Sequence, residues 1–132
     1  MTPLNKVKTM YAAFSRGDIP AILSGLAPDV EWEYGANTPP VPWLKPRRGR
    51  DAVAGFFEAL KDVDIVRFEP TSLVADGNLV IALFDIELIV KATGKRVTEI
   101  DEVHIWRFNQ EGLVQKFRHQ VDSWTLAEAI AA

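Results

Sequence analysis

A strict alternation of side chains from Val80 to Val90 constrains the fold of this 132-residue chain more than any other feature. Asp85 and Glu87 stand among its odd positions, whereas every even position is apolar: Val80, Ala82, Phe84, Ile86, Leu88 and Val90. Successive side chains of a strand point to opposite faces. The pattern therefore predicts a strand that turns its even face toward a core.

The chain has strand character from about Val63 almost to its end. Three pairs ending in glycine divide this region where hairpin turns are expected: Asp76-Gly77, Thr93-Gly94 and Glu111-Gly112. Glycine accepts the positive φ that such turns need. We therefore predict a meander of about four antiparallel strands, followed over residues 123–132 by a short helix or a frayed tail.

The first part of the chain has helical spacing instead. Thr2 and Asp18 are residues that cap helices, and Gly17 is a residue that ends one. The resulting prediction is three helices, near residues 3–16, 18–26 and 50–61.

Alternation over residues 30–34 predicts one early strand, and the proline-rich residues 35–49 are predicted to form a loop or lid. Helices followed by a strand meander indicate the α+β fold class, with helices packed on one face of an antiparallel sheet. The length fits one domain over residues 1–132.

Composition excludes several classes of function. The absence of cysteine rules out a disulfide scaffold and thiolate chemistry. With 15 Lys and Arg against 18 Asp and Glu, no basic face for nucleic acid is indicated. No apolar run reaches the roughly 20 residues that cross a bilayer, and the first residues have no signal-peptide core. A cytoplasmic protein with neither nucleic-acid nor membrane partners is expected.

The lengths of the loops decide which later side chains share the inner face. A three-residue turn over residues 92–94 places Lys91 opposite Lys95. Even positions then pair with even positions, which turns inward Glu102, His104, Trp106 and Phe108.

A four-residue loop over residues 109–112 brings the odd positions of the last strand to the same face. In this register Glu102 lies directly across from His119. The inner face is predicted to line one cavity, with Tyr34 near its mouth. The residues predicted to line that cavity are Phe84, Glu102, His104, Trp106, Phe117 and His119.

A series of short motifs extends along nearly the whole chain: Tyr11-Ala-Ala-Phe14 with Gly17-Asp18, Leu26-Ala-Pro-Asp29-Val30, Gly49-Arg-Asp-Ala52, Thr93-Gly94-Lys95, Val103-His104-Ile105-Trp106-Arg107-Phe108 and Phe117-Arg118-His119. In this order they resemble the NTF2-like superfamily, in particular its SnoaL-like and ketosteroid-isomerase-like members. The resemblance implies a cone made of a curved antiparallel sheet wrapped around N-terminal helices. It also implies an apolar mouth for a small molecule, commonly in a homodimer.

The resemblance does not extend to the acids of the known enzymes. The base aspartate of the isomerases aligns with Tyr34, and their oxyanion-hole acid aligns with His104. The Arg and Asp of limonene-epoxide-hydrolase-like members align with Phe84 and Ile86. The pocket acid on the last strand aligns with His119, which keeps a titratable group there. Steroid isomerisation and epoxide hydrolysis are therefore disfavoured.

Four residues are candidates for catalysis: the two histidines of the chain, His104 and His119, with Glu102 and Tyr34. The histidines would exchange protons with the substrate, and Tyr34 would donate a hydrogen bond to a developing oxyanion. Glu102 would orient His119 and raise its pKa, whereas His104 would titrate lower. The alternatives are hydrogen-bonded core histidines and a solvated Glu102 at the rim.

Two histidines and Glu102 also match the ligand set of a facial-triad metal site. The resemblance implies a metal-free fold, so no metal is expected. An organic cofactor is not expected either, because the chain has no phosphate-binding loop or dinucleotide fingerprint.

Five aromatic residues are candidates for ligand binding, with an ordinary core role as the alternative: Trp32, Trp43, Phe84, Trp106 and Phe117. Trp43 lies in the proline-rich segment, where it would either cap the pocket or anchor the loop. A short basic run is either solvated or attracts an anionic substrate: Lys45, Arg47, Arg48 and Arg50.

The leading hypothesis is a small SnoaL-like enzyme of the isomerase, cyclase or hydratase type, acting on a mostly apolar substrate that contains a carbonyl group. The alternative is a non-catalytic module for ligand binding or dimerisation. A homodimer is expected because the outer sheet face carries many apolar side chains: Ile81, Leu83, Ile89, Val103 and Ile105.

Overall fold

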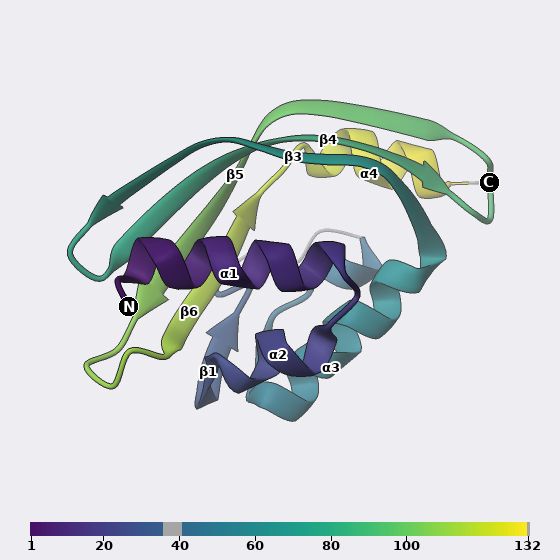
Figure 1. The fold of residues 1–132 in the computed structure, drawn as a ribbon. Coiled ribbons are helices and arrows are strands. Elements are labelled where there is room, and N and C mark those ends of the chain that lie inside the picture. The colour runs from purple at the N-terminus through teal and green to yellow at the C-terminus, as the bar shows by residue number, and fades with distance from the viewer. Residues whose placement is uncertain (36–40, 132) are drawn as a thin grey trace.

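The computed structural model of the chain describes residues 1–35 and 41–131. Its elements are α1 (Pro3–Ser15), α2 (Ile19–Ser24), β1 (Leu26–Trp32), η1 (Pro42–Leu44), β2 (Arg47–Arg48), α3 (Arg50–Ala59), η2 (Leu60–Asp62), β3 (Val63–Asp76), β4 (Leu79–Val90), β5 (Arg96–Phe108), β6 (Val114–Gln120) and α4 (Ser123–Ile130). The six strands form one sheet in the order β2-β1-β6-β5-β4-β3. Strands β3, β4 and β5 arch over α1 (Figure 1), which confirms the α+β class and the curved sheet around N-terminal helices.

The two N-terminal helices begin where the sequence predicts, but α2 ends at Ser24 rather than near residue 26. The side chain of Thr2 accepts a hydrogen bond from the backbone N–H of Asn5, and that of Asp18 accepts one from Ala21. Each therefore satisfies a donor that a helix N-terminus leaves free. Between the helices, Gly17 has a φ of 72°, which glycine adopts without the clash that a Cβ atom would cause.

Strand β1 differs from its prediction in extent and in pairing. It covers Leu26–Trp32 rather than residues 30–34, so Leu26 belongs to the strand and not to the preceding helix. It pairs in parallel with β6, and the sheet is therefore mixed. Pairing with a strand some 90 positions away outweighs the local helical spacing, because the strand's backbone groups and the buried Leu26 side chain both find partners there.

The segment predicted as a loop or lid contains two short elements in its described part, η1 and β2. Strand β2 pairs with β1 at the sheet edge. Val41, Trp43 and Leu44 are buried, so this part of the segment belongs to the core. Pro39 and Pro40 lie outside the described residues. None of the helices within residues 1–35 and 41–131 is long and apolar enough to cross a membrane.

The even face of β4 is inward, as its alternation predicts, although the turn after it differs. Val90 rather than Lys91 pairs with Lys95, so β4 and β5 begin one residue out of the predicted register. A bulge near Asp101, whose φ is 61°, then shifts the pairing by one residue. Beyond it Phe84 pairs with Glu102, as predicted. The two deviations cancel, and the even positions of β5 from Glu102 onward face inward.

The pairing of β5 with β6 is displaced by two residues from the prediction. His104, not Glu102, lies across from His119. The turn supplies one residue of the shift, because the backbone N–H of Asn109 donates to the carbonyl of Leu113. A bulge between Arg107 and Phe108 supplies the other. Since the side-chain period of a strand is two, a shift of two keeps His119 on the inner face but changes its partner.

Candidate active site

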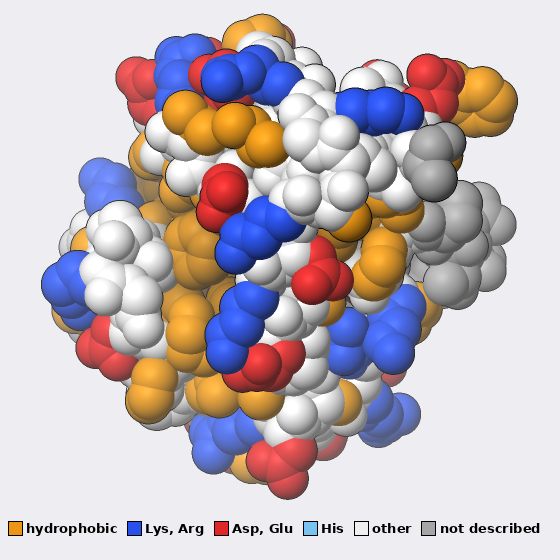
Figure 2. Space-filling view, turned by 90° about the vertical axis from the view of Figure 1, so that its right-hand side faces the viewer, with side chains coloured by type: hydrophobic (Ala, Val, Ile, Leu, Met, Phe, Trp, Pro, Cys, Tyr) orange, Lys and Arg blue, Asp and Glu red, His pale blue; other side chains and the backbone are white. Residues whose placement is uncertain are grey.

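A mostly apolar cavity of about 80 Å³ lies between the inner sheet face and the helices. This is several times the ~10–15 Å³ that a cavity needs to hold one water molecule, so the cavity can hold a small organic molecule. Its lining includes half-buried side chains of α1, α3 and β3: Phe14, Phe57 and Phe68. Figure 2 shows hydrophobic side chains at the surface on the side of the molecule that lies to the right in Figure 1.

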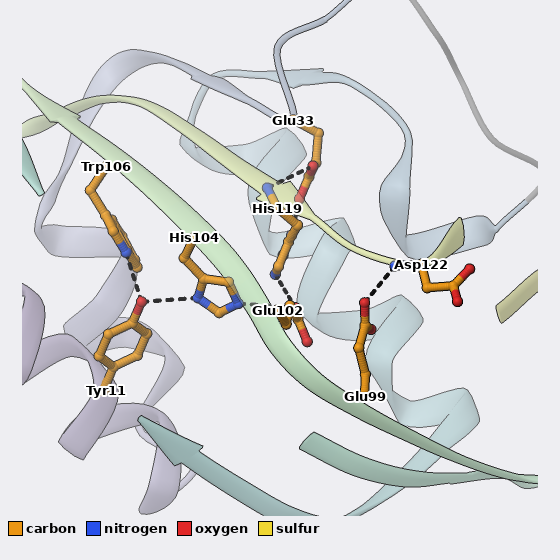
Figure 3. A network of polar contacts seen from close by, with 8 residues as sticks. All are labelled: Tyr11, Glu33, Glu99, Glu102, His104, Trp106, His119 and Asp122. Carbon is orange, nitrogen blue, oxygen red and sulfur yellow. Dashed lines mark hydrogen bonds and ion pairs between the residues drawn. The ribbon is translucent and has the colours of Figure 1, made fainter. Parts of the chain in front are cut away.

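Four polar side chains lie on the cavity wall that is formed by α1 and β5 (Figure 3). The indole Nε1–H of Trp106 donates to the hydroxyl of Tyr11, at 2.8 Å. The same hydroxyl lies 2.9 Å from Nδ1 of His104. The other ring nitrogen of His104, Nε2, lies 3.0 Å from a carboxylate oxygen of Glu102. His104 and Glu102 are buried, so these contacts form one continuous row away from bulk water.

His119 lies next to the end of this row and has a carboxylate on each side. Its Nδ1 is hydrogen-bonded to Glu33, whose carboxylate also accepts the backbone N–H of His119. Its Nε2 lies 3.9 Å from Glu102, which is too far for a direct hydrogen bond. Among the described residues Nε2 has no hydrogen-bond partner, and His119 lines the cavity. A ligand atom between His119 and Glu102 could therefore contact both.

The environment separates the pKa values of the two histidines. Burial lowers the pKa of His104, and the neighbouring His119 lowers it further, against the opposing effect of Glu102. Burial also acts to lower the pKa of His119, but Glu33 and then Glu102 outweigh it and raise that pKa. The directions match the sequence prediction. The main partner of His119 does not, because it is Glu33 rather than Glu102.

Three further groups in the cavity have displaced pKa values. Burial acts to raise the pKa of Glu102, but the hydrogen bond from His104 and the charge of His119 lower it, so Glu102 is ionised. Burial raises the pKa of the Tyr11 hydroxyl well above its usual value, so Tyr11 keeps its proton. Glu99 also lines the cavity, and burial raises its pKa.

The structure brings together most of the predicted site residues. Lining the cavity are Trp32, Trp43, Glu102, His104, Trp106, Phe117 and His119. Trp43 is buried in η1 and contributes to the wall, so it is more than a loop anchor.

Phe84 and Tyr34 lie elsewhere than predicted. Phe84 is fully buried behind His104, where its ring stacks on the imidazole at 4.4 Å, and it supports the wall without lining the cavity. The Tyr34 hydroxyl accepts a hydrogen bond from Arg107, and the Tyr34 ring lies near Lys116 and Arg118. These side chains belong to the outer sheet face, so Tyr34 cannot serve the cavity as an oxyanion donor.

The chain direction after β1 explains why Tyr34 points outward. Glu33 has a φ of 59°, in the left-handed region, which interrupts the alternation that would turn Tyr34 inward. The carboxylate of Glu33 reaches His119 instead. Sequence reasoning missed Glu33, Glu99 and Tyr11 as site residues. Only for Tyr11 was there a signal, a hydroxyl-bearing side chain on the apolar stripe of the first helix.

The predicted facial-triad set also comes together, with donor atoms of Glu102, His104 and His119 within 4.8 Å of one another. Nε2 of His104 is occupied by its hydrogen bond to Glu102, however, and a metal ion would have to replace that proton. In the basic run, Arg47 and Arg50 donate to backbone carbonyls, and neither lines the cavity. Their positions give no support to the anionic-substrate alternative.

The model of the SnoaL-like domain family matches residues 7–117, which is most of the chain. The chain belongs to the SnoaL-like domain family. Among curated proteins, none matches it.

Solved structures similar to this SnoaL-like chain have the NTF2-like fold. An NTF2-like protein from Burkholderia thailandensis E264 is 26% identical with a TM-score of 0.86, and the alignment covers 100% of this chain and 99% of that one. An NTF2-like protein of unknown function from Burkholderia pseudomallei K96243 is 26% identical with a TM-score of 0.84, covering 98% of both chains. TerC, co-crystallised with polyporic acid, is 23% identical with a TM-score of 0.82, also covering 98% of both chains.

Proposed function

We propose that this SnoaL-like protein is an enzyme that moves protons on a small, mostly apolar molecule containing a carbonyl group. The reaction would be of the isomerase, cyclase or hydratase type. One observation carries the proposal: the imidazole of His119 and the carboxylate of Glu102 face each other across 3.9 Å on the wall of an apolar cavity. A raised pKa on His119 and a lowered pKa on Glu102 supply an acid and a base near neutral pH.

In the proposed reaction, Nε2–H of protonated His119 donates its proton to the carbonyl oxygen of the substrate. Glu102 takes a proton from the adjacent carbon, and the electron pair of that C–H bond forms the C=C bond of an enol. Where the substrate has a further C=C bond next to this carbon, the product is a dienol, and return of a proton to the far end of that bond gives an isomer. Attack of the enol carbon on a second carbonyl group of the same molecule gives a ring.

The surroundings support this assignment of roles. Glu33 holds Nδ1 of His119, which directs Nε2 toward Glu102. The apolar lining, to which Trp32, Trp106 and Phe117 belong, limits water and strengthens the electrostatic interactions inside the cavity. No Lys or Arg is among the residues found in that lining, which favours an uncharged substrate over an anionic one.

Exchange of deuterium into small ketones tests the proposal without knowledge of the natural substrate. Cyclohexanone and acetophenone in D₂O should gain deuterium next to the carbonyl faster with the protein than with buffer. Glu102→Gln should slow this exchange by about 10²–10⁴-fold, the usual contribution of a general base. Tyr34→Phe, which alters the outer sheet face, is the matched control and should leave exchange unchanged. Ketones that bind with no exchange above buffer would favour the ligand-binding module instead.

We also propose that the protein forms a homodimer through the outer face of the sheet. Half-buried apolar side chains pair there across β4 and β5, Ile81 with Ile105 and Leu83 with Val103. Covering such a face with a second copy removes apolar surface from water. The oligomeric state in solution tests this.

A further inference from the structure

The row from Trp106 to Glu102 has a donor at one end and an acceptor at the other (Figure 3). The indole Nε1 of Trp106 can only donate a hydrogen bond. The ionised carboxylate of Glu102 can only accept one. The two groups between these ends, Tyr11 and His104, can each do both. The ends therefore decide which way every proton in the row points.

From the Trp106 end, the Tyr11 hydroxyl accepts the indole N–H and has one proton left to donate. Among the described residues, the acceptor within reach of that proton is Nδ1 of His104, at 2.9 Å. From the Glu102 end, Nε2 of His104 must carry a proton, because two lone pairs would otherwise face each other at 3.0 Å. Both ends therefore place the proton of His104 on Nε2 and leave Nδ1 without one.

We propose that Tyr11 is a positioning residue that holds His104 neutral, with its single proton fixed on Nε2, and that Glu102 rather than His104 is the base. Neither nitrogen of His104 then has a lone pair free for a substrate. Nδ1 is occupied by Tyr11, and Nε2 donates its proton to Glu102. The stacked ring of Phe84 keeps the imidazole plane in this orientation.

His104, a candidate for catalysis in the sequence, thereby loses its role as a base. That Glu102 receives a proton from substrate rests on the proposed function. The protonation pattern of His104 belongs to the free protein, however, and can be measured without any substrate. The two statements can therefore fail separately.

Nitrogen-15 NMR of the histidine rings tests the protonation pattern directly. In the free protein at pH 8 the spectrum should show His104 with Nε2 protonated and Nδ1 bare. A spectrum showing the proton on Nδ1 overturns the proposal, and this result needs no variant.

Substitution of the two tyrosines of the chain tests the part played by Tyr11. In Tyr11→Phe, Nδ1 of His104 loses its donor and becomes able to take a proton, so the pKa of His104 should rise. The titratable groups that act on His104 are Tyr11 from α1, Glu102 from its own strand, His119 from β6 and, more weakly, Glu33 after β1. Tyr34→Phe removes a hydroxyl outside the cavity and should leave the His104 titration unchanged. An unchanged titration in folded Tyr11→Phe contradicts the role of Tyr11.

The deuterium exchange assay distinguishes a positioning role of His104 from a catalytic one. In His104→Gln the amide N–H can still donate to Glu102, but the side chain cannot take up a proton. Exchange should stay within about tenfold of wild type, compared with the ~10²–10⁴-fold loss expected for Glu102→Gln. His104→Ala, which removes the donor, should be slower than His104→Gln. Equal and complete losses in His104→Gln and Glu102→Gln would make His104 itself the base.

Discussion

His104 and His119 are directly paired across β5 and β6, with ring centroids 4.6 Å apart, and yet their pKa values are displaced in opposite directions. The ring of His104 is buried and that of His119 is largely so, which by itself lowers the pKa of a histidine. The difference comes from their partners. His119 is hydrogen-bonded to Glu33 and lies near Glu102, whereas His104 shares Glu102 and faces the neutral hydroxyl of Tyr11.

The two histidines should titrate separately. His119 should remain protonated above its ordinary value of about 6.5, and His104 should remain neutral below it. The measurement is a titration of both imidazoles by NMR between pH 5 and 9. Titration of both rings at the same pH would contradict the environments described above.

Glu33 should control the titration of His119 more strongly than Glu102 does. Glu33→Gln removes the hydrogen-bonded charge and should lower the pKa of His119, whereas Glu102→Gln, whose oxygen lies 3.9 Å away, should lower it less. Glu31→Gln is the matched control, because Glu31 pairs with Lys116 and should not affect His119. A larger shift in Glu102→Gln than in Glu33→Gln would reverse this order.

The raised pKa of His119 should also make stability depend on pH. A group that binds its proton more tightly in the folded state stabilises that state fully below its unfolded pKa of about 6.5. This contribution is lost as pH rises through the folded pKa. Chemical denaturation at pH values around and above the pKa of His119 should therefore show the free energy of unfolding of wild type declining toward higher pH. The decline should be smaller in Glu33→Gln. If the free energies of unfolding of the two proteins changed in parallel with pH, the Glu33–His119 pair would contribute nothing to this pH dependence.

Phe84 should contribute to stability as a core residue and to the site through His104. Its side chain is fully buried and stacked on the imidazole. Phe84→Ala should lower the free energy of unfolding by about 3–5 kcal/mol, the usual cost of emptying such a position. Denaturant unfolding measures the loss, and a value below about 1 kcal/mol would be inconsistent with the packing. Phe84→Leu keeps most of the side-chain volume, so the protein should stay folded. The effect of losing the stacked ring on the titration of His104 can then be measured.

Disruption of the outer sheet face should abolish the proposed dimer. Wild type should sediment as a dimer at micromolar concentration, and Ile105→Arg should sediment as a monomer because it places a charge in the apolar patch. Ser15→Arg makes the same charge change on an exposed position of α1 and should remain dimeric. A monomeric wild type would contradict the proposal.

The sequence alone was sufficient to predict the fold class and the inner face of the long strands. Thr2 and Asp18 act on backbone groups three residues away, and Gly17 acts through its own φ, so their effects can be predicted locally. The alternation from Val80 to Val90 has the period of the strand backbone itself. A shift of two residues does not alter which face a side chain occupies, and His119 was therefore placed correctly even though its register was not.

The partners within the site were decided by the tertiary structure. Three local features leave no periodic signal in the sequence: the turn at Asn109, the bulge before Phe108 and the positive φ of Glu33. The turn and the bulge place His104 rather than Glu102 opposite His119. The positive φ brings the carboxylate of Glu33 to the ring of His119. Tyr11 reaches His104, which lies 93 positions later in the chain, because α1 packs under the sheet. Periodicity determines the face on which a side chain lies. Which residues it contacts depends on the combined register shifts of every turn and bulge between them, and these shifts are set only in the folded chain.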